Sequence, residues 1–280
     1  MSLVDVTRSA TKSRRVPPLL VFGVLGVVLL VYFALPFVVF LGRTGSVPVV
    51  ETLLQTTSRT AVRNSLLTAP VATAISTVFG VPLAYVLARK TFPGKRLVEA
   101  LVVLPLVVPP VVGGAMLLSV VGRFTPIGAA AAQVGLPLTD SFVGIVLAQT
   151  FVAAPFVVIT SRAGFGSIDE RLEQASRSLG CGPIATFRRV TLPLARRAIV
   201  AGVVLTFSRA IGEFGATMMV AYNPRTIPTR IWVDFIAGGI DAIVPLALAL
   251  LAVTLVVVAT VQRFAGVPTV VEQEASNSIE

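Results

Sequence analysis

A run of 27 residues without a single charge, 16–42, constrains this chain more than any other feature. Roughly 20 consecutive apolar residues are enough for a helix to cross the hydrocarbon core of a bilayer, and five further apolar stretches of similar length follow this one. Charged residues make up 13% of the 280 positions, which is about half the share of roughly 25% typical of soluble domains. We therefore predict an all-α membrane protein.

Six transmembrane helices are predicted, at residues 16–42, 64–88, 100–121, 141–161, 198–222 and 242–262. An even number of spans places both termini on one side of the membrane. If that side is the cytoplasm, the inner segments hold 16 of the 23 Lys and Arg residues and the outer segments hold 6. The positive-inside rule describes this asymmetry, so both termini of this multi-pass protein of the cell membrane are predicted to be cytoplasmic.

The predicted domain organisation has three segments. Residues 1–15 form a basic cytoplasmic N-terminus, residues 16–265 form the transmembrane domain, and residues 266–280 form an acidic cytoplasmic tail whose polar composition is typical of disorder. The first span is too long for the apolar part of a cleavable signal peptide, and no A-x-A site follows it. We therefore expect this span to be retained.

Composition also excludes several kinds of function. The chain has no His and one Cys, Cys181, which excludes a dense metal site, Ser-His or Cys-His catalysis and a disulfide framework. It has no GxxxxGKS or GxxxxGKT motif for nucleotide phosphates. Its basic residues do not form a face with interleaved aromatics, as nucleic-acid binding requires. We expect neither catalysis nor a bound metal or cofactor in this chain.

The third span holds residues that interrupt an ordinary helix. Within ten positions it has three prolines and two glycines, Pro105, Pro109, Pro110, Gly113 and Gly114. Proline removes a backbone donor and clashes with the preceding turn, so a straight helix is not expected. Backbone groups freed at membrane depth are tolerated only against protein or a water-filled cavity. Pro109 and Pro110 therefore belong either to a helix that lines or gates a pathway or to an ordinary kink.

The fifth span contains an arginine and a glutamate four positions apart. Five of its residues have the helical spacing i, i+3, i+4, i+7 and i+8, namely Arg209, Gly212, Glu213, Ala216 and Thr217. This spacing predicts one small and polar helix face. Ionisable residues inside a span are costly unless they are paired or hydrated, and Arg209 can pair with Glu213. The face either lines a translocation path as a gate or only holds helices together.

Two predicted outer segments are longer than simple turns. Residues 123–140 are apolar enough to lie along the membrane surface. Residues 222–241 contain Arg230, Trp232 and Phe235, a composition that suits either a docking surface for a partner or an anchor at the membrane interface.

A basic cytoplasmic loop, residues 162–197, carries seven of the 23 Lys and Arg residues. A polar helix is predicted over 167–179 and ends at Gly180. Its apolar face comprises Leu172, Ala175 and Leu179. A second short helix, 185–192, is predicted to end at Pro193. Two short helices joined at a glycine suit a groove in a soluble partner. The alternative is an ordered loop whose arginines only follow the positive-inside rule, which would explain the charge but not the two helices.

The loop resembles the EAA loop of binding-protein-dependent ABC permeases. In that family the pattern is Glu-Ala-Ala, three residues, Gly, nine residues, Ile, one residue and Leu-Pro. This chain matches the spacing but departs from the pattern at Gln174, Ser176 and Val190. The resemblance implies the fold of a type I ABC importer permease, with a coupling loop seated in a groove of a separate ATPase subunit. The coupling residues that it implies are Glu173, Gln174, Ala175, Ser176, Gly180, Leu192 and Pro193.

Over residues 60–265 the chain is similar to the molybdate/tungstate branch of these permeases. The similar segments are LPLVVPPVVGG, RAIGEFGAT, VAYNPRTIPTRIW and DAIVPLALALLAVTL. The resemblance implies a homodimer embedded in lipid that passes a tetrahedral oxyanion inward. It also implies an extracytoplasmic oxyanion-binding protein and two copies of an ATPase subunit, on which ATP and Mg would be bound.

Three alternatives stay open at this point. A sulfate or thiosulfate permease shares the same features. An ion-coupled secondary carrier usually has several intramembrane ionisable residues in relay, whereas this chain has one pair. A membrane-embedded enzyme would need an acid and a base, and Glu213 is the only carboxylate well inside a predicted span.

Overall fold

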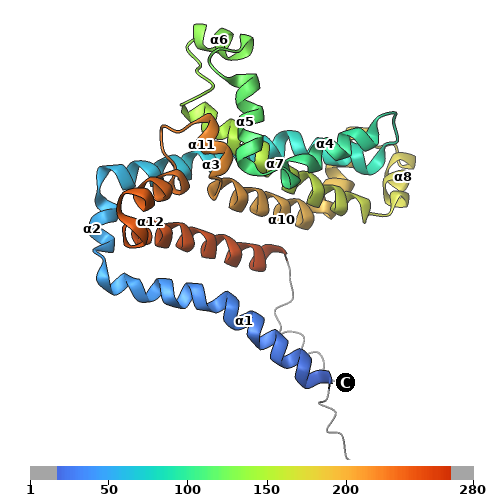
Figure 1. Cartoon of the computed structure of the whole chain (residues 1–280). Coiled ribbons are helices and arrows are strands. Elements are labelled where there is room, and N and C mark those ends of the chain that lie inside the picture. Colours follow the sequence, from blue (N-terminus) through green and yellow to red (C-terminus); the bar gives the residue numbers. More distant parts are fainter. Residues whose placement is uncertain (1–17, 266–280) are drawn as a thin grey trace, which may run out of the picture. The chain divides into compact units, whose positions relative to one another are not determined.

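The computed structural model describes residues 18–265, and within this range the chain forms helices and loops without any strand (Figure 1). Five helices are long and apolar enough to cross a membrane, or up to six spans if one bent pair is counted as a span. The predicted all-α membrane class is therefore confirmed. The predicted terminal segments, 1–15 and 266–280, lie outside the described residues.

The described chain divides into two compact units, one that ends at Val47 and one that begins at Pro48. The first unit consists of α1 (Pro18–Gly42) and a 3₁₀ turn, Arg43–Ser46. The large apolar side chains of α1 from Phe22 onward are exposed. A helix that is apolar all round is typical of a membrane span, so the first predicted span is helical as expected.

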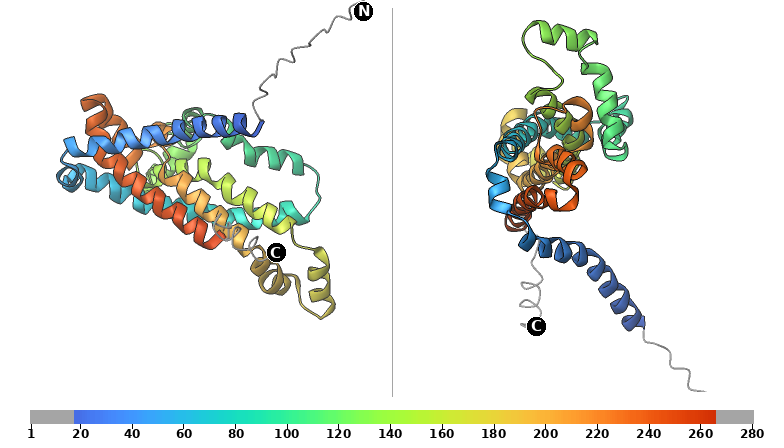
Figure 2. Two further views of the ribbon diagram at one scale, coloured as in Figure 1. Left: turned by 90° about the horizontal axis from the view of Figure 1, so that it is seen from below. Right: turned by 60° about the vertical axis from the view of Figure 1, so that its left-hand side comes forward.

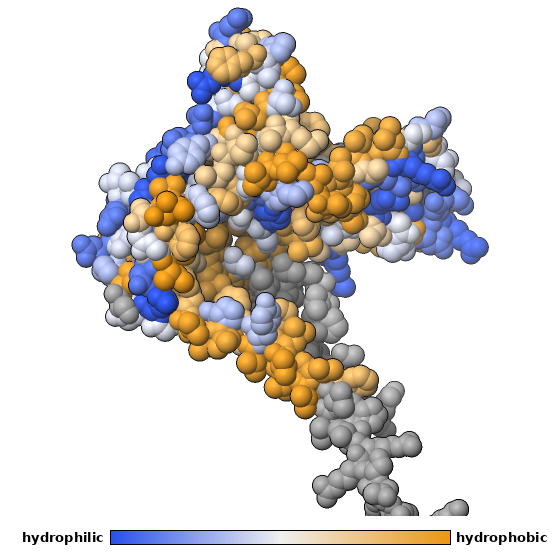
Figure 3. Space-filling view, in the orientation of Figure 1, coloured by the Kyte–Doolittle hydropathy of each residue, from blue (hydrophilic) through white to orange (hydrophobic). Residues whose placement is uncertain are grey.

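Three long helices form the centre of the second unit. They are α3 (Thr56–Arg89), α7 (Phe142–Gly166) and α10 (Leu192–Ile211), and they run alongside one another (Figure 2). Small residues dominate one of their buried contacts, where Ala69, Ala72, Ala153 and Ala210 are fully buried. Small side chains let helix backbones approach closely in a membrane. Figure 3 shows apolar side chains over the middle of this unit and hydrophilic ones gathered at the α8 end.

The third predicted span consists of two helices. α4 (Lys95–Val107) and α5 (Pro110–Val121) are bent by 120° across a two-residue break. Val108 and Pro109 are extended there, with ψ of 130° and 133°, because a residue that precedes proline is driven out of the helical region. The expectation that these prolines interrupt the span is confirmed.

The fifth predicted span is also interrupted, and the expected single polar face is wrong. α10 ends at Ile211, and the short helix α11 (Gly215–Val220) begins after a three-residue break. Arg209 and Gly212 therefore lie on one side of the break and Ala216 and Thr217 on the other. The physical reason is that the Glu213 carboxylate accepts a hydrogen bond from the Ala216 N–H at 2.7 Å, which caps α11 instead of continuing α10.

The sixth helix begins earlier than predicted. α12 spans Ile227–Ala265 and contains one non-helical residue, Gly239, whose φ is 71°. Much of the predicted outer segment 222–241 is therefore helical. The remaining helices are short: α2 (Val49–Leu54), α6 (Pro126–Gln133), α8 (Glu170–Ser178) and α9 (Pro183–Thr186).

Close packing of α5 on α11 yields a prediction about stability. A Cβ atom on Gly114 would lie 2.7 Å from the Ala216 Cα and 2.9 Å from its carbonyl oxygen, whereas a Cβ on Gly166 would meet nothing within 4 Å. We expect Gly114→Val to cost about 1–3 kcal/mol through overpacking and to lower the midpoint of thermal unfolding in detergent. Gly166→Val is the control. Equal midpoints for the two variants would contradict the observed packing.

Candidate functional site

Residues 169–191, here called the coupling element, project from the helical bundle at one end of α3. α8 begins where the Asp169 carboxylate accepts a hydrogen bond from the Arg171 N–H at 2.9 Å, an ordinary helix N-cap. It ends before Gly180, whose φ of 86° lies in the left-handed region that favours glycine. The predicted bend at Gly180 between two short helices is therefore confirmed.

The second half of the coupling element is continuous with the fifth span. After α9 the chain forms a π-helix, Phe187–Thr191, and passes directly into α10, so that Pro183–Ile211 is one helical run. The prediction that Pro193 ends the second helix is wrong. Pro193 lies in the first turn after the wider π-helical stretch, where its missing N–H and its ring interrupt no regular α-helical turn.

A buried ion pair fixes the coupling element to α3. Glu173 Oε1 accepts hydrogen bonds from Arg89 Nε and from Thr191 Oγ1, each at 3.0 Å. Arg89 Nη2 also donates to the Ile168 carbonyl at 3.0 Å. Both charged side chains are buried. Glu173, which was predicted to contact an ATPase, therefore faces its own chain.

Ser176 is the second predicted coupling residue that faces inward. Its hydroxyl lies 3.1 Å from the Thr186 hydroxyl, which ties α8 to α9. Gln174, Ala175 and Pro193 are exposed, and Leu192 is half-buried. The predicted residues thus fall into two groups, one that holds the element together and one that is accessible.

The coupling element exposes three large apolar side chains among its polar ones. Leu172 is exposed, Leu179 is 86% exposed and Ile184 is 76% exposed. Three exposed large apolar side chains on an otherwise polar element make it a candidate for a protein interaction site. The apolar face predicted for α8 is therefore present and accessible.

A second candidate site is the ion pair at the break between α10 and α11. Glu213 is 1% exposed, and its Oε2 forms an ion pair with Arg209 Nη2 without the alignment of a hydrogen bond. Its Oε1 caps α11 through the Ala216 N–H. The guanidinium and the backbone donor together offset the burial of the carboxylate. Arg209 is partly exposed and Gly212 is exposed, while Ala216 and Thr217 are buried.

The structure brings the two helix breaks together. A Cβ on Gly215 would lie 3.0 Å from the Pro110 side chain and from the Val111 nitrogen, so the proline break of α4 and α5 packs on the start of α11. The predicted path residues Pro109 and Pro110 are thus close to the Glu213 cap, which the sequence did not indicate.

Sequence reasoning also missed Gln149. It lies on α7, is fully buried, and neither of its amide atoms has a hydrogen-bond partner among the described residues. A lone glutamine inside an apolar span was the available signal, since buried polar groups are costly unless they are paired. Thr206 and Thr217 are likewise buried without a partner for the hydroxyl.

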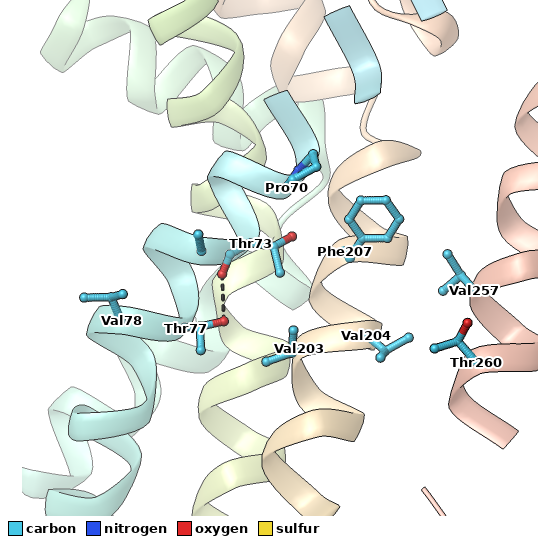
Figure 4. Close-up of a pocket in the computed structure, with 10 residues that line it drawn as sticks. Pro70, Thr73, Thr77, Val78, Val203, Val204, Phe207, Val257 and Thr260 are labelled. Carbon is cyan, nitrogen blue, oxygen red and sulfur yellow. Dashed lines mark hydrogen bonds between the residues drawn. The ribbon is translucent and has the colours of Figure 1, made fainter. Parts of the chain in front are cut away.

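A cavity of about 640 Å³ between α3, α10 and α12 is mainly apolar, unlike the two candidate sites above (Figure 4). It is lined by apolar side chains such as Phe207 and Val257, and its threonine hydroxyls are occupied, because Thr73 and Thr77 each donate to a carbonyl of their own helix at 2.7 Å. Among the described side chains that line it, none is charged. Such a groove suits hydrocarbon and offers nothing to an anion. No group of three or more potential metal ligands occurs within the described part of the chain.

Comparisons with known proteins agree with this architecture. A family model described as "binding-protein-dependent transport system inner membrane component" matches residues 80–267. A probable molybdenum ABC transporter permease protein of Haloferax volcanii is 46% identical over 248 residues, which cover 89% of each chain. The molybdate/tungstate transport system permease protein WtpB of Thermococcus kodakarensis is 41% identical over 244 residues, which cover 86% of this chain and 94% of that one.

Solved structures match as well. A bacterial ABC transporter involved in import of the acidic polysaccharide alginate has a TM-score of 0.68 and 18% identity, and the match covers 89% of this chain and 96% of that one. This likeness concerns the fold.

The anchoring of the coupling element can be tested with two neighbouring glutamates. Glu173→Ala strands the buried guanidinium of Arg89, which costs about 3–5 kcal/mol for a buried pair. Glu170, whose side chain is 64% exposed and 3.7 Å from Arg89, contributes about 1 kcal/mol or less, so Glu170→Ala is the matched control. We expect faster tryptic cleavage at Arg171 and Arg177 in Glu173→Ala only, measured by mass spectrometry. Identical cleavage rates in both variants would contradict the anchoring role.

Proposed function

Because the chain belongs to the binding-protein-dependent transport system inner membrane component family, it is the membrane permease of an ABC importer, and we propose that its cargo is molybdate or tungstate. Its fold is that of a type I importer permease, as the resemblance of the loop implied. The proposal on cargo is carried by one observation. Two relatives that are 46% and 41% identical to this chain, over 89% and 86% of its length, are named as a molybdenum and a molybdate/tungstate permease.

The alternatives are less well supported. Within the spans predicted from the sequence, the described residues form one ion pair, Arg209 with Glu213, and not the series of ionisable groups expected of an ion-coupled carrier. The chain is a transport component, and hydrolysis of ATP belongs to a partner. A sulfate or thiosulfate permease remains the nearest alternative, since sulfate has the same shape and charge as molybdate.

The proposed partners follow from the accessible surfaces. The exposed apolar residues Leu172, Leu179 and Ile184 would seat the coupling element in a groove of the ATPase subunit, which would bind ATP and Mg and be present in two copies. The inward-facing Glu173 and Ser176 would keep the element in a shape that fits. An extracytoplasmic oxyanion-binding protein would deliver the cargo at the other end of the bundle.

A homodimer with cytoplasmic termini completes the proposal. One chain with a single interrupted fifth span offers half a pathway, and two copies related by a two-fold axis would enclose a whole one. The orientation is supported by the excess of Lys and Arg in the predicted inner segments.

The Arg209–Glu213 pair would act as a gate with low affinity for the cargo. A bare guanidinium binds oxyanions strongly in bidentate geometry, and such a site would retain the anion. Glu213 neutralises Arg209 and repels an anion, so the pair can shape the path without becoming a strong site. Selectivity would then rest with the binding protein.

Uptake in proteoliposomes tests the proposed cargo. The permease, its ATPase and its binding protein are reconstituted, and ATP-dependent uptake of tungstate, molybdate and sulfate is measured with each anion alone and in competition. We expect uptake of tungstate and molybdate, with sulfate a poor competitor. Uptake of sulfate in preference to both would overturn the assignment of cargo.

Coupling to the ATPase can be tested at two glycines of the coupling element. A β-branched residue at Gly180 must adopt a left-handed conformation at a cost of roughly 1–2 kcal/mol, which would displace the exposed apolar face. Gly182 has an ordinary φ of −66° and open space around it, so Gly182→Val is the matched control. We expect Gly180→Val to abolish uptake and stimulation of ATP hydrolysis while membrane insertion is retained. Normal uptake in this variant would refute the role of the bend.

The gate can be tested with a double-mutant cycle. Arg209→Ala leaves the buried Glu213 unpaired, and we expect a loss of about 3–5 kcal/mol and a low yield of folded protein. Glu213→Gln can still cap α11 through its amide oxygen, so it should fold but transport slowly. The combined variant should recover the stability that Arg209→Ala loses, measured as the midpoint of thermal unfolding. A combined variant no more stable than Arg209→Ala would show that the pair does not account for the loss.

A further inference from the structure

A polar pocket of about 370 Å³ lies at the end of the second unit opposite the coupling element. It is formed by the first turns of α3, the loop between α11 and α12, and the first turn of α12. Its polar lining comprises Thr56, Thr57, Thr60, Asn223, Arg225 and Arg230. α3 has 34 residues, which correspond to roughly 50 Å of helix, and its other end carries Arg89 of the coupling anchor. The pocket therefore faces the side on which cargo would arrive.

The two arginines of the pocket differ in their partners. Arg230 is neutralised by Asp234, with Nε–Oδ2 and Nη2–Oδ1 distances of 2.9 and 2.8 Å. Arg225 has no carboxylate partner among the described residues. Its guanidinium lies 5.1 Å from the centroid of the Tyr222 ring, and Nη2 donates to the Tyr222 hydroxyl at 3.3 Å. Its Nε is buried and has no hydrogen-bond partner. The pocket thus holds one guanidinium charge that no carboxylate of the described residues neutralises.

The loop that carries Arg225 is held firmly. Asn64 Nδ2 donates to the Arg225 carbonyl at 2.8 Å, and the Ile227 N–H donates to Ser65 Oγ at 2.8 Å. Asn64 and Ser65 are both buried in α3. The backbone beside the guanidinium is therefore fixed before any ligand arrives, which lowers the entropy lost on binding.

The remaining groups of the pocket also favour a negative charge. The N-terminus of α3 has no acidic residue in its first turn and no side-chain cap, so its first N–H groups and the positive end of the helix dipole are uncompensated. Thr56 and Thr57 add hydroxyl groups at the same end. A guanidinium with hydroxyl and amide donors suits a tetrahedral oxyanion, whose oxygens accept several hydrogen bonds at once.

We propose that this pocket is a receiving site that binds the tetrahedral oxyanion before it reaches the Arg209–Glu213 pair. The inference rests on the proposed function for the identity of the cargo. Position supports it, because the Arg225 loop directly follows α11, the helix that Glu213 caps. A carboxylate from a docked protein shares part of this chemistry, and the test below separates the two sources.

The test is equilibrium dialysis of the permease–ATPase complex in nanodiscs, without binding protein, against tungstate and, separately, sulfate, with bound anion measured by elemental mass spectrometry. We expect saturable binding of the anion weaker than micromolar. Arg225→Gln should weaken it about tenfold or more, since a hydrogen bond to a charged group contributes about 1.5–3 kcal/mol. Arg225→Lys keeps the charge but loses the planar, bidentate guanidinium, so its affinity should lie between those of the unchanged protein and Arg225→Gln.

Arg123→Gln is the matched control, because it removes the same charge from the same end of the unit. Arg123 is 68% exposed and lies 3.9 Å from Asp140, whose N–H bonds to the last residue of α11. We expect Arg123→Gln to bind the anion with the same affinity as the unchanged protein. No saturable binding, or equal weakening by Arg123→Gln and Arg225→Gln, would overturn the receiving site. Acetate that competes as well as sulfate would overturn it in favour of a carboxylate from a docked protein.

Failure of the receiving site can be distinguished from failure of the proposed cargo. Uptake of tungstate without saturable binding in the dialysis overturns only the receiving site. Uptake of sulfate in place of tungstate overturns only the cargo, and the receiving site is then judged from the sulfate arm of the dialysis.

Discussion

The structure depends most on how its interrupted helices satisfy their backbone groups. In a bilayer an unpaired N–H or C=O costs several kcal/mol, so a break at membrane depth needs an internal partner. Glu213 supplies that partner for α11, and Arg209 in turn offsets the buried charge of Glu213. The second break, at Pro109 and Pro110, packs on the same helix through Gly215. The two helix breaks therefore pack against each other.

The same arrangement links the two ends of the molecule. The helical run Pro183–Ile211 begins within the coupling element and ends one residue before the break that Glu213 caps. Because a helix is stiff along its axis, a displacement of the coupling element would reach Arg209 at the far end of this run. Glu173 and Arg89 join the start of this run to α3, so α3 and α10 would move together when an ATPase moves the element.

The sequence predicts those features that depend on local composition. The apolar spans, the interruption at Pro109 and Pro110 and the bend at Gly180 follow from length, from the missing proline N–H and from the left-handed region. Long-range pairs are different. Glu173 and Arg89 lie 84 positions apart, and no local pattern indicates that this glutamate faces inward. Helical spacing likewise placed Glu213 on a continuous face, because periodicity does not register a carboxylate that caps the next helix.

Three arginines of the second unit show how pairing decides what a guanidinium can do. Arg89 is buried against Glu173 with its hydrogen bonds filled by protein, so it serves the fold. Arg209 is partly exposed and is neutralised by Glu213, so on the proposed path it would attract an anion only weakly. Arg225 has an aromatic ring and a hydroxyl beside it but no carboxylate among the described residues. On the proposed path an anion would leave the unpaired Arg225 for the neutralised Arg209, so its affinity for the protein would fall along the way. A transporter needs this order, because a path whose deepest point bound most tightly would hold its cargo.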